Sequence, residues 1–312
     1  MTITFKNTRF IIALLAMLMI GCTGEHNKSS SGEITKPYVV TTIGMIYDAV
    51  LNIAGNKVEA IALMGPGVDP HLYKATQGDL KKLRRADLIL YGGLHLEGKM
   101  GEVFEKLGKI KPVVAVTKDI PKDKLRDSEV YQNAYDPHVW FDVSLWKNAV
   151  QTVTSALIQI DPKNKDTYNE NSKEYLLRLD SLHDQVSKMI QTIPENQRIL
   201  VTAHDAFGYF GDAYGIEVKG LQGISTLSEP GLKDISELVG LITQRKIKAV
   251  FLETSVSEKA INAVVQGCKQ RGHNVLVGGS LFSDAMGEFG TFEGTYVGMV
   301  TTNVNTIVNA LK

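Results

Sequence analysis

The stretch "KNKDTYNENSKEYLLRLDSLHDQVSKMIQTIP" at residues 163–194 decides how the rest of the chain is organised. Its interior contains neither proline nor glycine, and prolines flank it at Pro162 and Pro194. Apolar residues recur in it at spacings of three and four, the pattern of one apolar helical face: Leu179, Leu182, Val186, Met189 and Ile193. A helix of about 28 residues spans about 42 Å. We therefore expect a strut that runs the length of two lobes.

Short apolar, β-branched runs stand on both sides of this strut, separated by helical stretches. The first half contains "VVTTI" (39–43), "VEAIALM" (58–64), "ADLILYGG" (86–93) and "VVAVT" (113–117). The second half contains "RILVTAHD" (198–205), "IEVKGL" (216–221), "AVFLET" (249–254) and "NVLVGG" (274–279). Such strands are typical of parallel sheets covered on both faces. The sequence predicts an α/β fold of two similar lobes, each with a four-stranded, mostly parallel sheet and helices on both faces.

The first residues are different in kind. Lys6 and Arg9 precede the apolar run "FIIALLAMLMIG" (10–21), which ends at Cys22. The run is too short for a membrane-spanning helix, which needs about 20 residues, and it is typical of a secretory signal peptide. The junction before Cys22 resembles a bacterial lipobox, which makes this cysteine the expected site of lipidation. A plain signal peptide cleaved elsewhere is the alternative.

The polar stretch after Cys22 contains few apolar residues and is expected to be a flexible tether. With Cys22 lipidated, only Cys268 remains, and its surroundings predict a buried helix residue without a disulfide. The chain thus divides into five expected parts: a signal peptide (1–21), the lipidated cysteine and tether (22–37), a first lobe (38–162), the linking helix (163–194) and a second lobe (195–312). We expect an extracytoplasmic, membrane-anchored protein.

The composition excludes one class of partner. The chain has 312 residues, 44% of them hydrophobic and 22% charged, with 34 basic and 34 acidic side chains. Such values are ordinary for a globular protein, and a balanced charge creates no field that attracts nucleic acid. We therefore expect no nucleic-acid partner.

The tripeptide Asp-Pro-His occurs twice, ending at His71 and at His138. Proline fixes its own backbone and restricts the residue before it, so both histidines have a rigid, similar approach. Asp69 and Asp136 are placed to accept local hydrogen bonds or to orient an imidazole. Two imidazoles presented in this way are suited to point at one ligand.

Two further candidates follow strands of the second half. His204 ends the run "RILVTAH", at the carboxyl edge where open α/β sheets bind ligands. Asp284 follows "NVLVGG" and is the nearest carboxylate to the matching edge. Three imidazoles and one carboxylate are a plausible set of ligands for a transition metal. Glu253, at the end of another strand, is a candidate to orient one of them.

These segments together resemble the metal-binding solute receptors of bacterial zinc and manganese ABC importers, the TroA-like class of periplasmic solute-binding protein family 9. The resemblance covers the chain after Cys22 and depends on four motifs in order: "DPHLYKAT" (69–76), "YDPHVWFD" (135–142), "VTAHDAFGYFGDAYGIEVKGLQGISTLSEPG" (201–231) and "GGSLFSDAMG" (278–287). It implies two lobes bridged by one long helix, with a metal bound between them. It also implies the ligands His71, His138, His204 and Asp284.

The same resemblance implies a receptor that passes its metal to an ABC permease and ATPase, and we expect it to act as a monomer. His95 is expected near the site without being a ligand. His26, His183 and His273 are expected to be plain surface residues.

The cargo stays open between two metals. Zinc-specific members often carry a His-rich and acid-rich loop between the first two ligands, but residues 96–137 contain no histidine. Manganese receptors often have a carboxylate at the third position, where this chain has His204. Three neutral nitrogens and one carboxylate suit four-coordinate zinc, whereas manganese favours more oxygen ligands. We expect zinc to bind more tightly, with manganese possible as the physiological cargo.

Two other functions compete with a metal receptor. A zinc-dependent hydrolase also uses histidines and a carboxylate, but it needs an open metal position and a general base. The sequence contains no HExxH motif, and four protein ligands leave little room for water. A surface adhesin is the third possibility, and no residue pattern here indicates it. We expect a protein that is not an enzyme.

Overall fold

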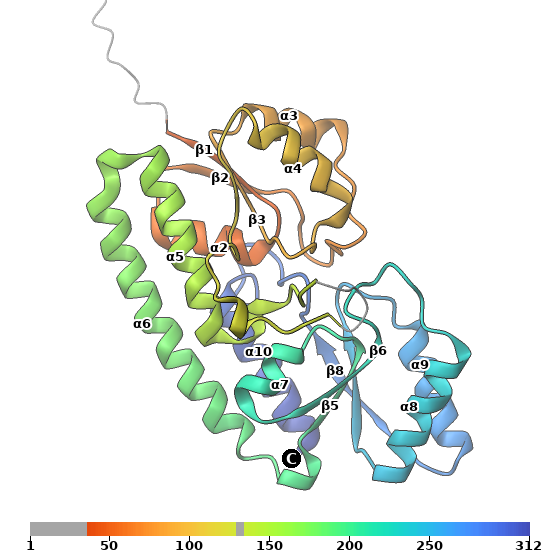
Figure 1. Ribbon diagram of the computed structural model, residues 1–312. Coiled ribbons are helices and arrows are strands. Elements are labelled where there is room, and N and C mark those ends of the chain that lie inside the picture. Colours follow the sequence, from red (N-terminus) through yellow and green to blue (C-terminus); the bar gives the residue numbers. More distant parts are fainter. Residues whose placement is uncertain (1–35, 129–133) are drawn as a thin grey trace, which may run out of the picture. The chain divides into compact units, whose positions relative to one another are not determined.

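The central stretch forms the helix α6, Lys165–Ile190, in the computed structural model, which describes residues 36–128 and 134–312. On the side of the first lobe α6 packs against α2 (Gly44–Ala54) and α5 (Val143–Ile160). On the side of the second lobe it packs against α7 (Gly208–Tyr214) and α10 (Tyr296–Leu311). Figure 1 shows α6 running beside both lobes. The expected strut is confirmed.

The buried face of α6 is longer than the apolar pattern predicts. Its buried residues follow one stripe from the first turn to the last: Tyr168, Ser172, Tyr175, Leu179, Leu182, Val186 and Ile190. The two tyrosines bury their rings while their hydroxyls donate to buried carboxylates. Tyr168 donates to Asp161 over 2.6 Å, and Tyr175 donates to Asp48 over 2.9 Å. Because their hydroxyls have buried acceptors, these two tyrosines extend the buried face of α6 beyond its apolar residues.

The first lobe is a parallel sheet with strand order β2-β1-β3-β4. Its strands are β1 (Tyr38–Thr41), β2 (Glu59–Ala62), β3 (Leu88–Tyr91) and β4 (Val113–Ala115). The helices α3 (Gln77–Arg85) and α4 (Gly101–Gly108) lie on one side of this sheet, and α2 and α5 lie on the other (Figure 1). A capping box between Thr76 and Asp79 begins α3, and Asp142 caps α5. Short 3-10 turns complete the lobe: Gly98–Met100, Lys122–Lys124, Val139–Phe141 and, before α6, Pro162–Asn164.

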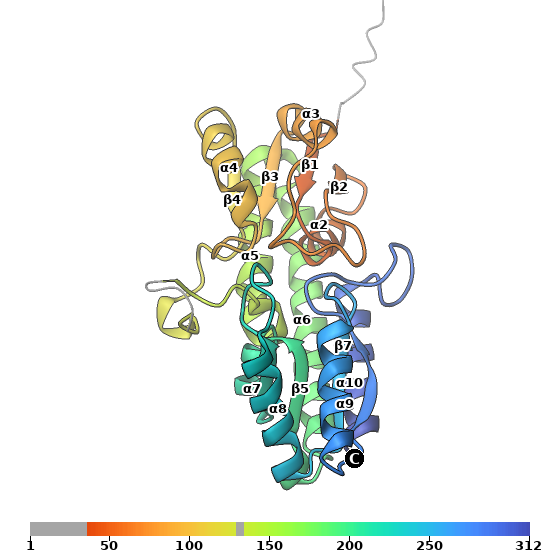
Figure 2. The ribbon, with the colours of Figure 1, turned by 90° about the vertical axis from the view of Figure 1, so that its right-hand side faces the viewer.

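The second lobe repeats this order. After the 3-10 turn Glu195–Gln197, its strands are β5 (Ile199–His204), β6 (Glu217–Gln222), β7 (Ala249–Glu253) and β8 (Leu276–Leu281). The single four-stranded sheet expected for this lobe is not found within the described residues, because hydrogen bonds join only β5 to β6 and β7 to β8, as two parallel pairs. The two pairs meet where β5 lies beside β7. The sequence of neighbours is therefore β6-β5-β7-β8. The helices α8 (Leu232–Arg245) and α9 (Lys259–Gln270) cover the face opposite α7 and α10 (Figure 2).

Most of the core is shared by the two lobes. One continuous cluster of buried side chains includes Val40 of β1, Trp146 of α5, Leu182 of α6 and Tyr296 of α10. A smaller cluster lies between β5, β7 and the helices α8 and α9, and it contains the buried thiol of Cys268. The prediction that Cys268 is a buried helix residue is confirmed. The shared core joins both lobes to α6 over a long contact.

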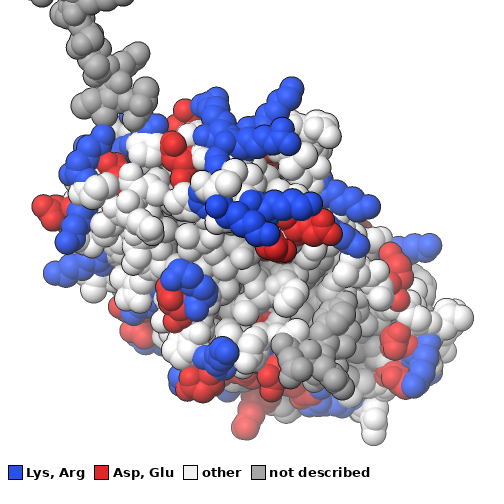
Figure 3. Space-filling view, turned by 45° about the horizontal axis from the view of Figure 1, so that its top comes forward, with Lys and Arg blue, Asp and Glu red and all other residues white. Residues whose placement is uncertain are grey.

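The membrane-related expectations lie elsewhere in the chain. The signal peptide, Cys22 and most of the tether fall within residues 1–35, outside the described residues. No helix within 36–128 and 134–312 combines the length and apolar character needed to cross a membrane. On the face seen in Figure 3, lysine and arginine side chains gather over the first lobe with acidic side chains among them. The last turn of α3 contributes Lys82, Arg84 and Arg85.

Candidate metal centre

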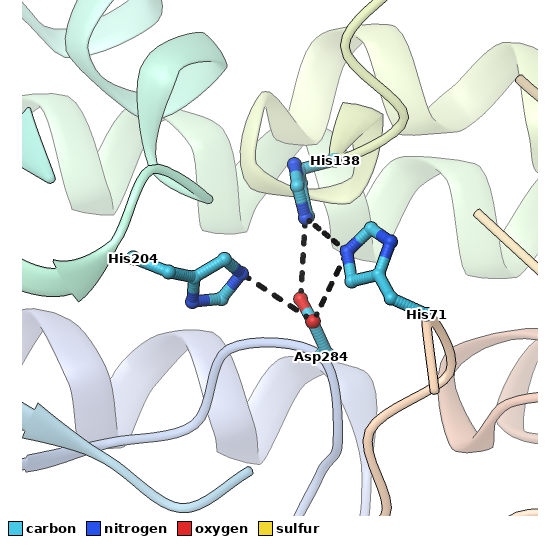
Figure 4. A group of neighbouring side chains, drawn as sticks. All are labelled: His71, His138, His204 and Asp284. Carbon is cyan, nitrogen blue, oxygen red and sulfur yellow. Dashed lines mark hydrogen bonds and ion pairs between the residues drawn. The ribbon is translucent and has the colours of Figure 1, made fainter. Parts of the chain in front are cut away.

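Four side chains from four separate segments converge between the lobes (Figure 4). His71 lies in the loop between β2 and α3, and His138 lies just before the turn that leads into α5. His204 is the last residue of β5, and Asp284 follows β8 by three residues. In the described part of the chain, these four are the group of His, Cys, Asp or Glu residues with the geometry to hold a metal ion. The structure thus brings together all four residues that the sequence singles out.

The distances within this group fit one small ion. Nε2 of His71 lies 3.3 Å from Nε2 of His138 and 3.5 Å from Oδ2 of Asp284. Nε2 of His138 and Nε2 of His204 each lie 3.4 Å from an oxygen of Asp284. Donors about 2.0–2.2 Å from zinc at tetrahedral angles are about 3.3–3.6 Å apart. These distances match the spacing of zinc ligands, and all four donor atoms lie within 4.8 Å of one another.

The donor atoms are buried and lack other partners. All four residues are buried, and the side chains of His138, His204 and Asp284 are fully enclosed. Among the described residues, Nε2 of His204 and both carboxylate oxygens of Asp284 have no hydrogen-bond partner. Buried polar atoms without a partner are costly and rare in folded proteins. Because these unpaired nitrogen and oxygen atoms face the same small space, we infer that a cation binds there.

Two of the histidines are oriented by carboxylates. Nδ1 of His138 lies 2.7 Å from Oδ1 of Asp136, which also accepts from the His138 backbone N–H over 2.9 Å. Nδ1 of His204 lies 2.5 Å from Oε2 of Glu253, and Oε1 accepts from the His204 backbone N–H over 2.7 Å. A carboxylate on Nδ1 fixes the tautomer and leaves Nε2 free for a metal. Both imidazoles are thus oriented toward the metal position before any metal arrives.

His71 is held differently. Oδ1 of Asp69 accepts from the backbone N–H of His71 over 2.8 Å, so Asp69 shapes the loop without contacting the imidazole. The other oxygen of Asp69 accepts from Thr226 of the second lobe over 2.5 Å. Asp69 therefore stabilises the turn before His71 and also links the two lobes. The imidazole of His71 has no carboxylate on Nδ1 among its described contacts.

Burial and charge set the proton affinities of the group. Burial lowers the pKa of His71 from 6.5 to about 4, against the opposing effect of Asp284. Burial also acts to lower the pKa of His138, but Asp136 and Asp284 outweigh it and raise that pKa to about 9. In the same way Glu253 and Asp284 raise the pKa of His204 well above its usual value. A metal entering at neutral pH must therefore displace protons from His138 and His204.

Aromatic side chains close the site on one side. The Trp140 ring lies 5.2 Å from the His138 ring, and its indole N–H donates to the Ser283 carbonyl over 3.1 Å. The Tyr296 hydroxyl donates to the Trp140 carbonyl over 2.6 Å. These contacts tie the segment of His138 to the segment of Asp284. They also exclude water, which strengthens electrostatic interactions within the site.

The remaining described histidines lie outside the donor group. His95 is exposed and lines, with His71, a cavity of about 520 Å³ beside the site. The prediction of plain surface positions for His183 and His273 is wrong, because both are half-buried and hydrogen-bonded. His183 lies 3.1 Å from the Tyr214 hydroxyl and so joins α6 to α7, and His273 lies 2.8 Å from the Ile247 carbonyl. His26 lies outside the described residues.

Sequence reasoning does not single out one buried carboxylate of the first lobe. Glu97 accepts from the Thr42 hydroxyl over 2.6 Å and from the Gly92 N–H over 2.7 Å. It therefore closes the ends of β1 and β3 in the first lobe. The paired glycines in "GGLHLEG" (92–98) are the signal that could have revealed it, because glycine lets backbone N–H groups approach a carboxylate closely.

Comparison with known proteins gives a consistent result. Residues 39–310 match the model of the family described as zinc-uptake complex component A, periplasmic. The chain is 52% identical over 295 residues to the manganese-binding lipoprotein MntA of Bacillus subtilis, covering 94% of this chain and 95% of that protein. It is 51% identical over 304 residues to the zinc-binding protein TroA of Treponema pallidum, covering 97% and 98%. The solved structure of that periplasmic protein superimposes with a TM-score of 0.87 at 54% identity, covering 88% of this chain and 99% of the other.

Proposed function

Because this chain belongs to the zinc-uptake component A family of metal-binding solute receptors, we propose that it binds one divalent transition metal through His71, His138, His204 and Asp284 and delivers it to an ABC importer. The single observation that carries the ligand assignment is the set of orphaned buried donors on His204 and Asp284. In a protein that never bound a cation, only the ion-pair contacts of 3.4–3.5 Å within the group would offset the burial of those atoms.

The protein is not an enzyme. The site itself is poorly suited to hydrolysis, since four protein donors occupy the positions that a catalytic zinc would share with water. The two carboxylates nearest the imidazoles, Asp136 and Glu253, are engaged on His138 and His204 and are not free to act as a general base.

Zinc is the tighter binder in this proposal. Three imidazoles and one carboxylate are a donor set that suits four-coordinate zinc, whereas manganese prefers more oxygen donors. The names of the two relatives do not decide the cargo, because one is called manganese-binding and the other zinc-binding at almost the same identity. Manganese therefore stays open as the physiological cargo, since the amount of each metal outside the cell matters as much as affinity.

The receptor acts outside the cytoplasm as a monomer, held to the membrane by a lipid on Cys22, and its partner is a permease with its ATPase. The apolar run ending in Gly21-Cys22 supports the anchor. Replacing Cys22 with serine should abolish lipid labelling and leave the precursor uncleaved or the protein released from the membrane. Undiminished lipid labelling in that variant would contradict the anchor.

Titration of the purified protein with zinc and with manganese tests the metal proposal. We expect one equivalent of each metal to bind, zinc more tightly, and no turnover of ester, peptide or phosphate substrates by the zinc-loaded protein. The variant Asp284→Asn should lose most of the affinity for both metals. Retention of full affinity by that variant would contradict the assignment.

A further inference from the structure

An antiparallel pair of short segments in the first lobe places Arg126 beside the carboxylate that orients His138. The backbone N–H of Asp136 donates to the Arg126 carbonyl over 2.9 Å, and Asp127 and Tyr135 form an antiparallel bridge. Within this pair, Nε of Arg126 lies 3.8 Å from Oδ2 of Asp136. The other oxygen of Asp136 is the one that faces His138. Arg126 and His138 thus lie on opposite sides of one carboxylate.

The second lobe is shaped to receive the Arg126 guanidinium. Its Nη1 donates to Asp212 of α7, and the group lies against Gly208, the first residue of α7. A Cβ atom on Gly208 would lie 2.6 Å from Nε and 3.0 Å from Cζ of Arg126, and 3.1 Å from Oδ2 of Asp136. A Cβ atom this close would force the arginine side chain to shift, so glycine is what allows the guanidinium to lie in this position. The guanidinium is therefore fitted into α7 and is not a loose surface cation.

A tyrosine of α7 bonds to both of these segments. The Tyr209 hydroxyl accepts from the backbone N–H of Arg126 over 3.0 Å and donates to the Asp136 carbonyl over 2.9 Å. α7 begins four residues after His204, so it follows one candidate ligand directly in the chain. Through Arg126 and Asp136 it also reaches a second candidate ligand, His138. One short helix therefore connects an imidazole of each lobe.

We infer that Arg126 is a positioning residue for metal binding: it holds the Asp136 carboxylate so that the His138 imidazole stays directed at the metal, and it transmits the position of α7 to that imidazole. The inference rests on the proposed ligand role of His138. Arg126 itself touches neither the metal nor an imidazole.

An ordinary surface ion pair would not act in this way. Exposed pairs contribute about 0–1 kcal/mol to stability, and the contact with Asp212 belongs to that class because Asp212 is exposed. Asp136 differs, since its side chain is only 2% exposed while that of Arg126 is 37% exposed. Removing the partner of a buried carboxylate costs more than removing the partner of an exposed one. The main energetic cost of removing Arg126 is therefore expected at Asp136.

The first test measures zinc affinity and dissociation rate in the full protein. Arg126→Gln should weaken zinc binding by about 3–10-fold, less than the 10–100-fold expected when a group that contacts the imidazole directly is removed. Arg126→Lys should restore part of the loss, and Gly208→Ala should reproduce it by displacing the guanidinium. The matched control is Arg85→Gln, which breaks an exposed ion pair with Glu59 elsewhere in the first lobe. It should leave zinc affinity unchanged.

A double-mutant cycle and a spectrum separate positioning from general destabilisation. In an Asp136→Asn background, Arg126→Gln should have little further effect on zinc affinity. In metal-free protein, Arg126→Gln should shift the proton NMR signal of the His138 Nδ1–H group. The position of this signal depends on the hydrogen bond between His138 and Asp136, so it reports on that bond without any metal. Equal losses in both backgrounds, or a lower melting temperature with unchanged affinity and an unshifted signal, would overturn the inference. Absence of zinc binding by the unaltered protein would contradict the proposed function instead.

Discussion

The two lobes share one strand order but differ in what the carboxylate at the ends of their two central strands binds. In each lobe the order reverses between two central strands, β1 and β3 or β5 and β7, and such points are where α/β sheets bind ligands. In the second lobe His204 and Glu253 end these strands, and the carboxylate holds the imidazole. In the first lobe the carboxylate of Glu97 accepts hydrogen bonds from the Thr42 hydroxyl and from backbone N–H groups, and no imidazole is among its partners in the described residues.

The same arrangement of strands therefore orients a metal ligand in the second lobe and closes the end of the sheet in the first. The carboxylate at the second-lobe crevice orients an imidazole that extends directly from a strand, so His204 is placed by a rigid element. The first lobe closes its crevice with Glu97 and supplies His71 and His138 from loops instead. Loops shaped by Asp-Pro can be adjusted without disturbing the sheet. The comparison predicts that His204 and Glu253 govern metal binding and that Glu97 governs stability.

The largest expected effect comes from the strand-held imidazole. His204→Ala should lower zinc affinity by more than about 100-fold, beyond the range found for groups that only orient a ligand. Isothermal titration with a competing chelator measures it. The matched control is His183→Ala, because His183 is a half-buried histidine bonded to Tyr214. A loss of less than tenfold for His204→Ala, or an equal loss in the control, would contradict the comparison.

The pH dependence should be steep and should extend above neutrality. Nearby carboxylates raise the pKa of His138 to about 9 and also raise the pKa of His204, so we expect both imidazoles to be protonated at neutral pH without metal. Zinc must then displace both protons, so affinity falls as pH falls, by about tenfold per pH unit for each proton displaced. We expect zinc affinity still to rise between about pH 7 and pH 9. A constant affinity over that range would show that these imidazoles are already neutral.

Two buried glutamates provide a matched pair. Glu253→Gln should lower zinc affinity by about 10–100-fold, because the amide cannot accept the Nδ1–H proton of His204 with the same strength. Glu97→Gln should leave affinity unchanged but reduce the free energy of unfolding by about 1–3 kcal/mol, since it weakens the closure of the first lobe. Chemical denaturation and zinc titration of both variants measure this. The opposite pattern would reverse the roles assigned to the two lobes.

A smaller effect is expected on the ratio of the zinc and manganese affinities. His204→Glu replaces a neutral nitrogen with an anionic oxygen, and it should narrow the preference for zinc over manganese because harder oxygen donors suit manganese. Competition between the two metals on one sample measures the ratio directly. Equal losses for both metals would mean that this position does not select between them.

The smallest expected effect is in overall dimensions. The buried stripe of α6 is continuous and contains no proline or glycine, so the helix resists bending. Release should instead involve the loops near His71 and Asp284, with the glycine-rich segments 65–67 and 287–290 as candidates. Small-angle scattering with and without zinc should show little change, while hydrogen exchange should change mainly in those loops. A large compaction on zinc binding would contradict a rigid strut.

The sequence predicted the strut, the strands and the four converging side chains. The helix could be predicted because an apolar stripe without breakers leaves few alternatives, and the strands because buried parallel strands are uniformly apolar. The repeated Asp-Pro-His motif identified two donors, and the resemblance to a family supplied the set of four. Each of these signals lies in one continuous stretch of sequence or in an ordered set of such stretches.

Contacts between distant segments were not predictable in this way. The hydrogen bond from Thr226 to Asp69 joins residues 157 positions apart, and Gly208 accommodates an arginine that lies far from it in sequence. His183 was assigned to the surface because the helix pattern alone does not show that Tyr214 lies beside it. Such pairings depend on how the lobes pack, which local patterns do not specify.

The central claim is that one metal site spans both lobes, with His204 as its strand-held ligand. Zinc K-edge X-ray absorption of the zinc-loaded protein tests it most directly, because scattering from imidazole rings counts the histidine ligands. We expect three imidazoles and one oxygen at about 2.0–2.2 Å in the unaltered protein. In His204→Ala, loaded at high zinc, we expect two imidazoles. An unchanged count of imidazoles in that variant would contradict the claim.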